Sequence, residues 1–327
     1  MTNPKGLSRT GKILISAPSM RIAVLCNDRL ALPALQLLLQ NRLIVAAGIP
    51  DRPSEATEII RQRCESGGAA VQTFDRQDLD SKLEAWLHQH QPDVVLVKTF
   101  PWKIPARLLS IPKFGFINFH YAPLPEFRGS SPLFWMIRNQ ATELGVSIHR
   151  MEATYDTGDI LLQRRVPLSP QMTSGMCTAQ LAYMGAEMTG ELLTGLLQAS
   201  LKPVAQENSK AGWYKRPVLT DMRINWQEMN AESVHALVRA CNPWAKGAPT
   251  SWKGWTFGIT FTTITLYPVP EGTPAGTVLA LDETNGLVVA CKDGSCLRVD
   301  IIYTEEGFFP GCQLLIFGLK SGDQLGE

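Results

Sequence analysis

Cysteine is too sparse and too irregularly spaced in this chain to suggest a disulfide framework or a metal site. The seven cysteines are odd in number, and no pair has the Cys-x-x-Cys spacing of zinc and redox motifs. We therefore expect reduced thiols and no metal. A cytoplasmic location is the simplest expectation, because disulfides persist in oxidising compartments.

The chain also lacks an excess of charge of one sign and long apolar runs. Charged residues make up 19% of the 327 residues and the net charge is +1, so composition indicates no commitment to nucleic acid or to an anionic membrane. No apolar stretch approaches the roughly 20 residues that cross a bilayer. The hydrophobic content of 45% instead predicts a soluble globular protein with two domains.

A dinucleotide-binding fingerprint is absent as well. The first expected strand, at 21–26, is followed by Asn27 and Asp28 and not by Gly-x-Gly-x-x-Gly. A nicotinamide cofactor is therefore not expected. Because residues that follow such a strand face the ligand crevice, we expect Asn27 and Asp28 to contact the substrate.

Changes in composition and residue pattern along the chain predict its domain organisation. Residues 1–20 are polar and basic, and their apolar piece is too short for a signal peptide, which predicts an amino-terminal extension with Met20 as an alternative start. We expect an α/β domain at 21–202, a linker at 203–225 and a second domain at 226–327.

Short apolar runs alternate with amphipathic ones through the α/β domain, as a parallel sheet covered by helices requires. The expected strands are 21–26, 43–48, 70–74, 94–97 and 114–119. The expected helices are 31–40, 54–64, 79–90, 131–139 and 173–199, with Ser54 as N-cap of the second. The pattern predicts a Rossmann-like, mostly parallel sheet with helices on both faces.

Polar residues end the last of these strands. Asn118 and His120 are two residues apart, so their side chains share a face at the carboxyl end of the strand, where ligands bind in such sheets. An amide that can donate to an oxyanion, beside an imidazole that can manage a proton, suits acyl transfer to an amine. Asp156, in a later Gly-bearing turn, is the candidate that orients His120. Purely local hydrogen bonding is the alternative for each residue taken alone.

Four ordered motifs resemble those of the formyltransferases that use 10-formyltetrahydrofolate. They are Asn118-Phe119-His120, Leu124-Pro125, Gly145-Val146-Ser147-Ile148 and Asp156-Thr157-Gly158. The resemblance implies that Asn118, His120 and Asp156 form the catalytic set. The chain departs from the common pattern at Ala122, Arg150 and Ala153, which affects the assignment of the substrate.

The resemblance also implies binding roles outside the catalytic set. Phe100, Trp102 and Ile104 match a loop that lines the pterin pocket, although aromatic residues could equally cap the sheet there. Leu124 precedes a peptide bond that is cis in the family, and we expect Leu124 and Asp156 to contact the cofactor. Arg128 would shape the entrance for an anionic substrate. His149 matches a position that is His in some members, and either a substrate contact or a satisfied strand-end role fits it.

The second domain is rich in short β segments broken by Gly and Pro. A helix at 231–241 precedes β-rich pieces at 256–267, 276–281, 286–291, 295–302 and 319–323. This spacing predicts a small OB-like barrel. The stretches 239–244 and 286–294 also resemble the carboxy-terminal domain of methionyl-tRNA formyltransferase.

The charge of the second domain argues against tRNA as the acceptor. From residue 208 onward there are ten Lys and Arg against twelve Asp and Glu, the wrong sign for holding phosphates. The tRNA enzyme follows its Asp-Arg-Pro with a basic loop, whereas Asp51-Arg52-Pro53 is followed here by Ser54-Glu55-Ala56-Thr57-Glu58.

We therefore expect transfer of a formyl group from 10-formyltetrahydrofolate to the primary amine of a small molecule, such as an amino sugar nucleotide or an amino acid-derived intermediate. The alternatives are a methionyl-tRNA formyltransferase, a 10-formyltetrahydrofolate hydrolase, and a non-catalytic binding module. No membrane partner is expected.

Overall fold

The computed structural model describes residues 20–243 and 246–326, which form two compact units. Unit one contains the chain up to Gly129 together with Leu144–Val166 and Thr178–Trp213. Unit two contains Ser130–Glu143, Pro167–Cys177 and the chain from Tyr214 onward. Each unit is therefore assembled from segments that are far apart in the sequence.

The units differ in detail from the expected ranges. Most of the predicted extension lies outside the described residues, but Met20 is described and is buried. Residues 203–213, which we expected in a linker, belong to unit one. This membership matters because one of these residues reaches the candidate site.

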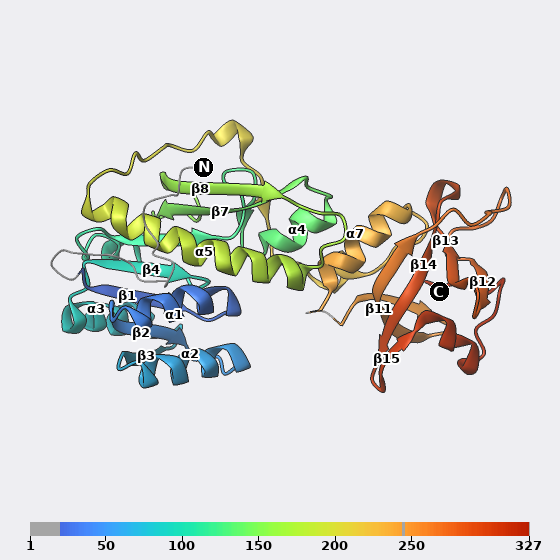
Figure 1. Cartoon of the computed structure of the whole chain (residues 1–327), viewed down its shortest axis with the longest axis horizontal. Helices are drawn as coiled ribbons and strands as arrows, with labels where there is room; N and C mark the ends of the chain where they lie inside the picture. Colours follow the sequence, from blue (N-terminus) through green and yellow to red (C-terminus); the bar gives the residue numbers. More distant parts are fainter. Residues whose placement is uncertain (1–19, 244–245, 327) are drawn as a thin grey trace, which may run out of the picture. The chain divides into compact units, whose positions relative to one another are not determined.

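A seven-stranded sheet forms the centre of unit one, with the order β3-β2-β1-β4-β5-β7-β8 (Figure 1). The strands are β1 Ile22–Cys26, β2 Ile44–Pro50, β3 Ala70–Phe74, β4 Val94–Lys98, β5 Phe116–His120, β7 Glu143–Arg150 and β8 Ile160–Pro167. The pairs among β1 to β5 are parallel, and β7 is antiparallel to β5. The predicted mostly parallel sheet is confirmed.

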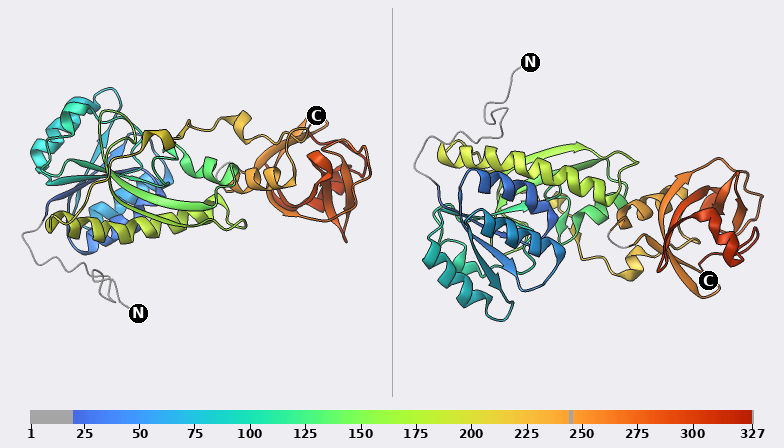
Figure 2. Two further views of the ribbon diagram at one scale, coloured as in Figure 1. Left: turned by 90° about the horizontal axis from the view of Figure 1, so that it is seen from above. Right: turned by 60° about the horizontal axis from the view of Figure 1, so that its bottom comes forward.

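Helices cover both faces of this sheet, with α3 on one face and α1 and α5 on the other (Figure 2). The helices are α1 Leu32–Gln40, α2 Glu55–Ser66, α3 Leu79–His90 and α5 Ser174–Leu197, with short 3-10 turns at Arg29–Ala31, Ala106–Leu108 and Asn208–Lys210. Ser54 caps α2, since its side chain accepts a hydrogen bond from the Thr57 N–H. In return, the Thr57 side-chain oxygen accepts a hydrogen bond from the Ser54 N–H. The predicted N-cap is confirmed.

Unit two is built around an antiparallel sheet with the order β10-β11-β14-β13-β12, in which β15 also pairs with β14. Its elements are α4 Pro132–Arg138, α6 Leu219–Met222, α7 Ala231–Cys241, β10 Ala248–Trp252, β11 Trp255–Ile264, β12 Val278–Asp282, β13 Gly286–Ala290, β14 Cys296–Thr304, β15 Gly307–Pro310, and 3-10 turns at Lys292–Gly294 and Gly311–Phe317. The helix α7 packs against β11 and α4. This small barrel-like architecture agrees with the predicted second domain.

One predicted β segment is wrong. Residues 319–323 follow the 3-10 turn at Gly311–Phe317 and form a further turn, in which the Asp323 carboxylate accepts from the Lys320 N–H at 3.1 Å. Gly322 supplies the positive φ of 89° that this turn needs. Turn chemistry therefore prevails over the apolar residue that begins the segment.

None of the described helices combines the length and the apolar character needed to cross a membrane.

The last residue of β4, Lys98, is fully buried between the sheet and α5. Its Nζ donates to Thr189 Oγ1 at 3.2 Å and lies 3.0 Å from the centre of the Phe119 ring. Within residues 20–243 and 246–326 it makes no ion pair with a carboxylate. Burial lowers the pKa of Lys98 well below its ordinary value, so the folded protein disfavours the charged form of this amine.

We expect Lys98→Met to stabilise the protein by about 1–3 kcal/mol at neutral pH, because Met fills the space without a polar group. Unfolded Lys98 binds a proton more tightly than the folded side chain does, so wild-type stability rises with pH up to the ordinary lysine pKa. The advantage of the variant should therefore shrink toward about pH 10. Thermal unfolding across this pH range measures it.

Lys82→Met is the matched control, because Lys82 is half exposed and pairs with Asp78 on the surface of α3. We expect it to change stability by less than about 0.5 kcal/mol. Loss of stability in Lys98→Met at neutral pH would contradict the assignment of Lys98 as an unfavourably buried amine.

Candidate active site

Strand β5 ends in the two polar residues that begin the site. Asn118 and His120 lie on the same face of the sheet, two residues apart at the carboxyl end of the strand. Because β7 runs antiparallel to β5, His149 is directly opposite Asn118 in the ladder. The Asn118 amide nitrogen lies 3.1 Å from His149 Nε2. The sheet itself therefore brings Asn118 and His149 together.

Asp156 reaches the same place from the turn between β7 and β8. Its Oδ1 lies 3.7 Å from His120 Nδ1 and 3.6 Å from His149 Nε2. Its Oδ2 accepts a hydrogen bond of 2.9 Å from the Gly129 N–H. The backbone of Asp156 is left-handed, with φ of 53°. One carboxylate oxygen is thus fixed by the backbone, and the other faces both imidazoles.

Only glycine fits two residues after Asp156. A Cβ on Gly158 would lie 2.0 Å from the Arg150 carbonyl oxygen, because the turn folds back onto the end of β7. The Arg150 N–H also donates to the Asp159 carbonyl at 3.0 Å. The spacing Asp-x-Gly is therefore a packing requirement that aims the carboxylate at the sheet.

Backbone carbonyls set the tautomers of the two imidazoles. His120 Nε2 lies 2.6 Å from the Phe127 carbonyl oxygen, and His149 Nδ1 lies 2.8 Å from the Arg150 carbonyl oxygen. A carbonyl can only accept, so these nitrogens carry the protons. In the neutral rings, His120 Nδ1 and His149 Nε2 then carry the lone pairs and face Asp156, and the Asn118 amide can donate to His149 Nε2.

Burial controls the charges of the site. Burial lowers the pKa of His120, which the nearby Asp156 carboxylate only partly opposes, so the imidazole is neutral at pH 7. Burial alone would raise the pKa of Asp156, but His120, His149 and the Gly129 N–H together hold it at about 2. At neutral pH the site therefore contains one carboxylate and an imidazole base ready to accept a proton.

This arrangement can polarise a carbonyl group and accept a proton. The Asn118 amide has a second N–H besides the one given to His149, and it can donate to an oxygen that gains negative charge. His120 and Asp156 can hold the proton of an attacking nucleophile. No group of three possible metal ligands occurs in the described part of the chain.

The expected pterin loop places its residues in different surroundings. Phe100 and Trp102 are partly buried and pack edge to face, with ring centres 5.5 Å apart. The Arg52 guanidinium lies 5.5 Å from the centre of the Trp102 ring. Ile104 is only 2% exposed and belongs to the core beneath α3. Of the three, only the two aromatic residues retain surface for a ligand.

Leu124 is also buried, and its peptide bond to Pro125 is cis, like the family bond that it resembles. Its N–H donates to Ser147 Oγ at 3.0 Å, and its carbonyl accepts from the Gln163 amide at 2.8 Å. The turn that follows β5 is therefore attached to β7 and β8.

Two of the remaining predicted substrate residues, Asp28 and Arg128, make hydrogen bonds within the protein. Asp28 accepts from the Leu30 N–H at 2.9 Å and caps a 3-10 turn, while Asn27 beside it is partly exposed. Arg128 is only 2% exposed, and its guanidinium binds Gln206 and Asn208. It does not lie at an entrance. Sequence reasoning missed Gln206, because no local pattern links it to Asp156, which it contacts through the backbone.

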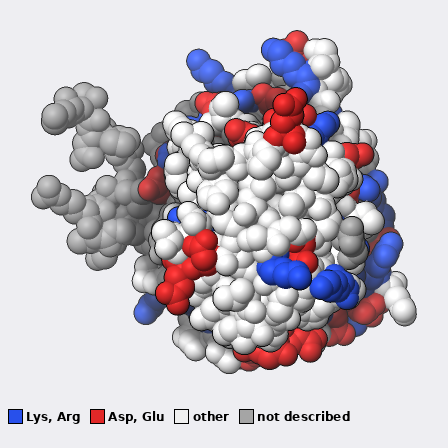
Figure 3. Space-filling model, turned by 90° about the vertical axis from the view of Figure 1, so that its right-hand side faces the viewer, with Lys and Arg blue, Asp and Glu red and all other residues white. Residues whose placement is uncertain are grey.

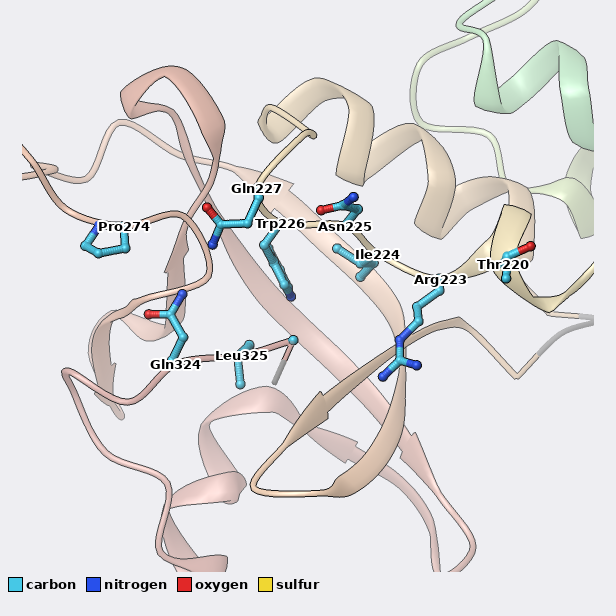
Figure 4. A pocket seen from close by; sticks show the side chains of 10 residues that line it. Thr220, Arg223, Ile224, Asn225, Trp226, Gln227, Pro274, Gln324 and Leu325 are labelled. Atoms are coloured by element: carbon cyan, nitrogen blue, oxygen red, sulfur yellow. The ribbon is translucent and has the colours of Figure 1, made fainter.

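A cavity of about 690 Å³ lies in unit two and contains none of the predicted site residues (Figure 4). The amides of Asn225, Gln227 and Gln324 line it together with Arg223, which donates to Ser251 Oγ at 3.0 Å. Arg223 is the single ionisable residue among its described lining residues. The volume is large, but the groups that could perform acid, base or nucleophilic chemistry are elsewhere.

Known protein families match both parts of the chain. The formyl transferase family matches residues 44–192, and its carboxy-terminal domain family matches residues 219–307. A methionyl-tRNA formyltransferase of Synechococcus sp. (strain JA-3-3Ab) is 32% identical over 294 residues, which span 85% of this chain and 89% of the relative. The sequence likeness therefore extends through both units.

Solved structures share the fold at lower identity. The sugar 3N-formyltransferase WlaRD superposes with a TM-score of 0.65 and 16% identity, covering 86% of this chain and 97% of that chain. An N-formyltransferase from Helicobacter canadensis gives 0.64 and 17%, covering 86% and 98%. The first structure was determined with dTDP and 5-N-formyltetrahydrofolate, and the second with folinic acid and dTDP-3-aminofucose.

The electrostatics of the site predict how His120 titrates. We expect its imidazole to titrate below pH 6.5, because burial outweighs the attraction of Asp156. Asp156→Asn removes the charge that favours the protonated ring, so the His120 pKa should fall further. NMR spectra of the imidazole protons recorded over a pH series measure both values.

His235 provides an internal reference in the same spectra, since it lies in unit two and bonds to Thr262 and Pro170. Its titration should not change in Asp156→Asn. A rise in the His120 pKa in that variant would show that Asp156 does not act on His120 as a charge.

Proposed function

Because this chain belongs to the formyltransferase family, we propose that it transfers the formyl group of 10-formyltetrahydrofolate to a primary amine. The observation that supports this best is the convergence of Asn118, His120 and Asp156 at the carboxyl end of β5. Structures with the same fold were solved with reduced folates, which supports the choice of donor.

Each residue has a role in the proposed reaction. The neutral amine attacks the formyl carbon, and the free N–H of Asn118 donates to the formyl oxygen as its negative charge grows. His120 Nδ1 and Asp156 accept the proton that the amine loses, and that proton returns to the departing nitrogen of the donor. The new C–N bond replaces the old one, so no oxidant or reductant is needed. Orientation of the amine supplies much of the remaining acceleration.

His149 has a positioning role in this scheme. It fixes the Asn118 amide through its Nε2, and its own Nδ1–H is anchored on the Arg150 carbonyl. His149, on the neighbouring strand, therefore orients the Asn118 amide before the substrates bind.

We propose a small molecule as the bearer of the amine. The chain passes from β2 through Asp51, Arg52 and Pro53 directly to the Ser54 cap, and Glu55 and Glu58 occupy the first turn of α2. This acidic turn disfavours a nucleic acid phosphate.

The charges of unit two support the same acceptor. Of its cations, Lys215 and Arg298 lie near Asp221 and Asp300, and Arg239 is buried. On the face drawn in Figure 3, Lys and Arg alternate with Asp and Glu around an uncharged area and form no continuous basic patch. That face therefore shows no cluster of cations of the kind that tRNA binding requires.

Methionyl-tRNA is the second candidate acceptor. Several relatives of about the same length carry the name methionyl-tRNA formyltransferase and are 32% identical to this chain, across both units. The likeness to sugar N-formyltransferases is in fold alone, at 16% and 17% identity.

Release of tetrahydrofolate from 10-formyltetrahydrofolate in the presence of different acceptors tests the function. The panel should contain amino sugar nucleotides, amino acids and charged initiator tRNA. We expect a small amine to accelerate release and to gain one formyl group by mass. Acceleration by the tRNA alone would identify the second candidate, and equal release without any acceptor would identify a hydrolase. No release with any acceptor would contradict transfer.

Loss of the oxyanion donor tests the mechanism. We expect Asn118→Ala to reduce kcat roughly 10²–10³-fold, as loss of such a donor does elsewhere, with a smaller effect on KM. Asn139→Ala is the matched control, because Asn139 is exposed at the end of α4. Undiminished transfer in Asn118→Ala would contradict the assigned role.

A further inference from the structure

Gln206 connects the Asp156 turn to a buried arginine. Its amide nitrogen donates to the carbonyl oxygens of Asp156, at 2.9 Å, and Gly158, at 2.8 Å. Its amide oxygen accepts two bonds from Arg128, from Nε at 3.1 Å and from Nη2 at 2.8 Å. Both amide protons and the oxygen of Gln206 are therefore engaged, which leaves a single orientation for the group.

The partners of Arg128 explain why the Gln206 amide is held firmly. Arg128 is only 2% exposed, and its guanidinium also donates to Asn208 at 3.0 Å and lies 5.2 Å from the centre of the Trp213 ring. Within the described ranges, no carboxylate forms an ion pair with Arg128. The amide oxygens are thus what stabilises this buried charge, and hydrogen bonds to a charged group are about twice as strong as neutral ones.

The Asp156 turn needs such support. A left-handed backbone at a residue other than glycine is unfavourable unless the surroundings fix it. Gln206 binds the carbonyl of Asp156, and the Gly129 N–H binds its carboxylate from the other side. Arg128 and Gly129 are consecutive and form the short strand β6 (Arg128–Gly129). This strand therefore holds the Asp156 carboxylate directly, through Gly129, and the Asp156 carbonyl indirectly, through Arg128 and Gln206.

We propose that Gln206, aimed by Arg128, is a positioning residue for Asp156 in the formyl transfer. Its two N–H bonds hold the turn so that Asp156 Oδ1 faces His120 Nδ1. The role of Gln206 in catalysis rests on the proposed function, but its effect on the geometry of Asp156 does not.

Two substitutions of Gln206 test this. Gln206→Glu keeps an oxygen for Arg128 but replaces the two donors with a carboxylate that repels the carbonyls of Asp156 and Gly158. Gln206→Met removes the donors without adding charge, and serves if the first variant fails to fold. We expect kcat to fall roughly 10–100-fold, as misplacement of a catalytic group does, with KM within about 3-fold of the wild type.

The titration of His120 separates positioning from general destabilisation. If Asp156 moves away, the His120 pKa measured by NMR should fall in the Gln206 variants, as in Asp156→Asn. Gln198→Met is the matched control, because Gln198 is exposed just after the end of α5 in the same unit. It should leave both kcat and the His120 titration unchanged.

Each result of these experiments bears on either the proposal or the proposed function. A folded Gln206 variant with unchanged kcat and unchanged His120 titration would overturn the proposal while leaving the proposed function intact. An equal loss in Gln198→Met would also overturn it, since the effect would then not depend on the contact with Asp156. If the wild-type protein transfers no formyl group, the proposed function fails, and the His120 titration alone decides whether Gln206 positions Asp156.

Discussion

The hydrogen bond from the Gly129 N–H to Asp156 Oδ2 is the contact on which the geometry of the site depends. It fixes Oδ2 on the backbone and leaves the other carboxylate oxygen, Oδ1, facing His120 and His149. Without it, a carboxylate on a strained turn could rotate toward solvent. A backbone donor suits this task because it has no side-chain rotamer to change. Its hydrogen bond to the carboxylate is charge-assisted at every pH at which Asp156 is ionised.

Burial gives this contact its chemical effect. The same removal from water that lowers the pKa of His120 also strengthens the attraction between a carboxylate and any proton that arrives on the imidazole. A neutral base beside a fixed charge is therefore poised to take up a proton from a substrate.

The parts of the molecule that follow local rules could be predicted from the sequence. The period of apolar residues located β1 to β5 to within a few residues, and the Ser54 cap located the start of α2. The grouping of Asn118, His120 and Asp156 was implied by the resemblance of four ordered motifs to those of the formyltransferases. The bond between Asn118 and His149 requires the antiparallel register of β5 and β7, and the interior position of Arg128 requires a segment that follows it by about eighty residues. Neither is encoded in local spacing.

The discontinuity of unit two has a consequence for dividing this protein into modules. The helix α4 lies early in the chain, yet it packs against α7, and its residues Phe134, Trp135, Met136 and Ile137 are buried. A fragment that ended at Trp213 would keep these four apolar side chains and lose α7, the helix against which α4 packs. The conventional boundary between the two matched families is therefore a boundary of sequence similarity and not one of autonomous folding. Insertions, fusions or exchanges of the carboxy-terminal part between relatives would have to carry α4 and its partner surface together.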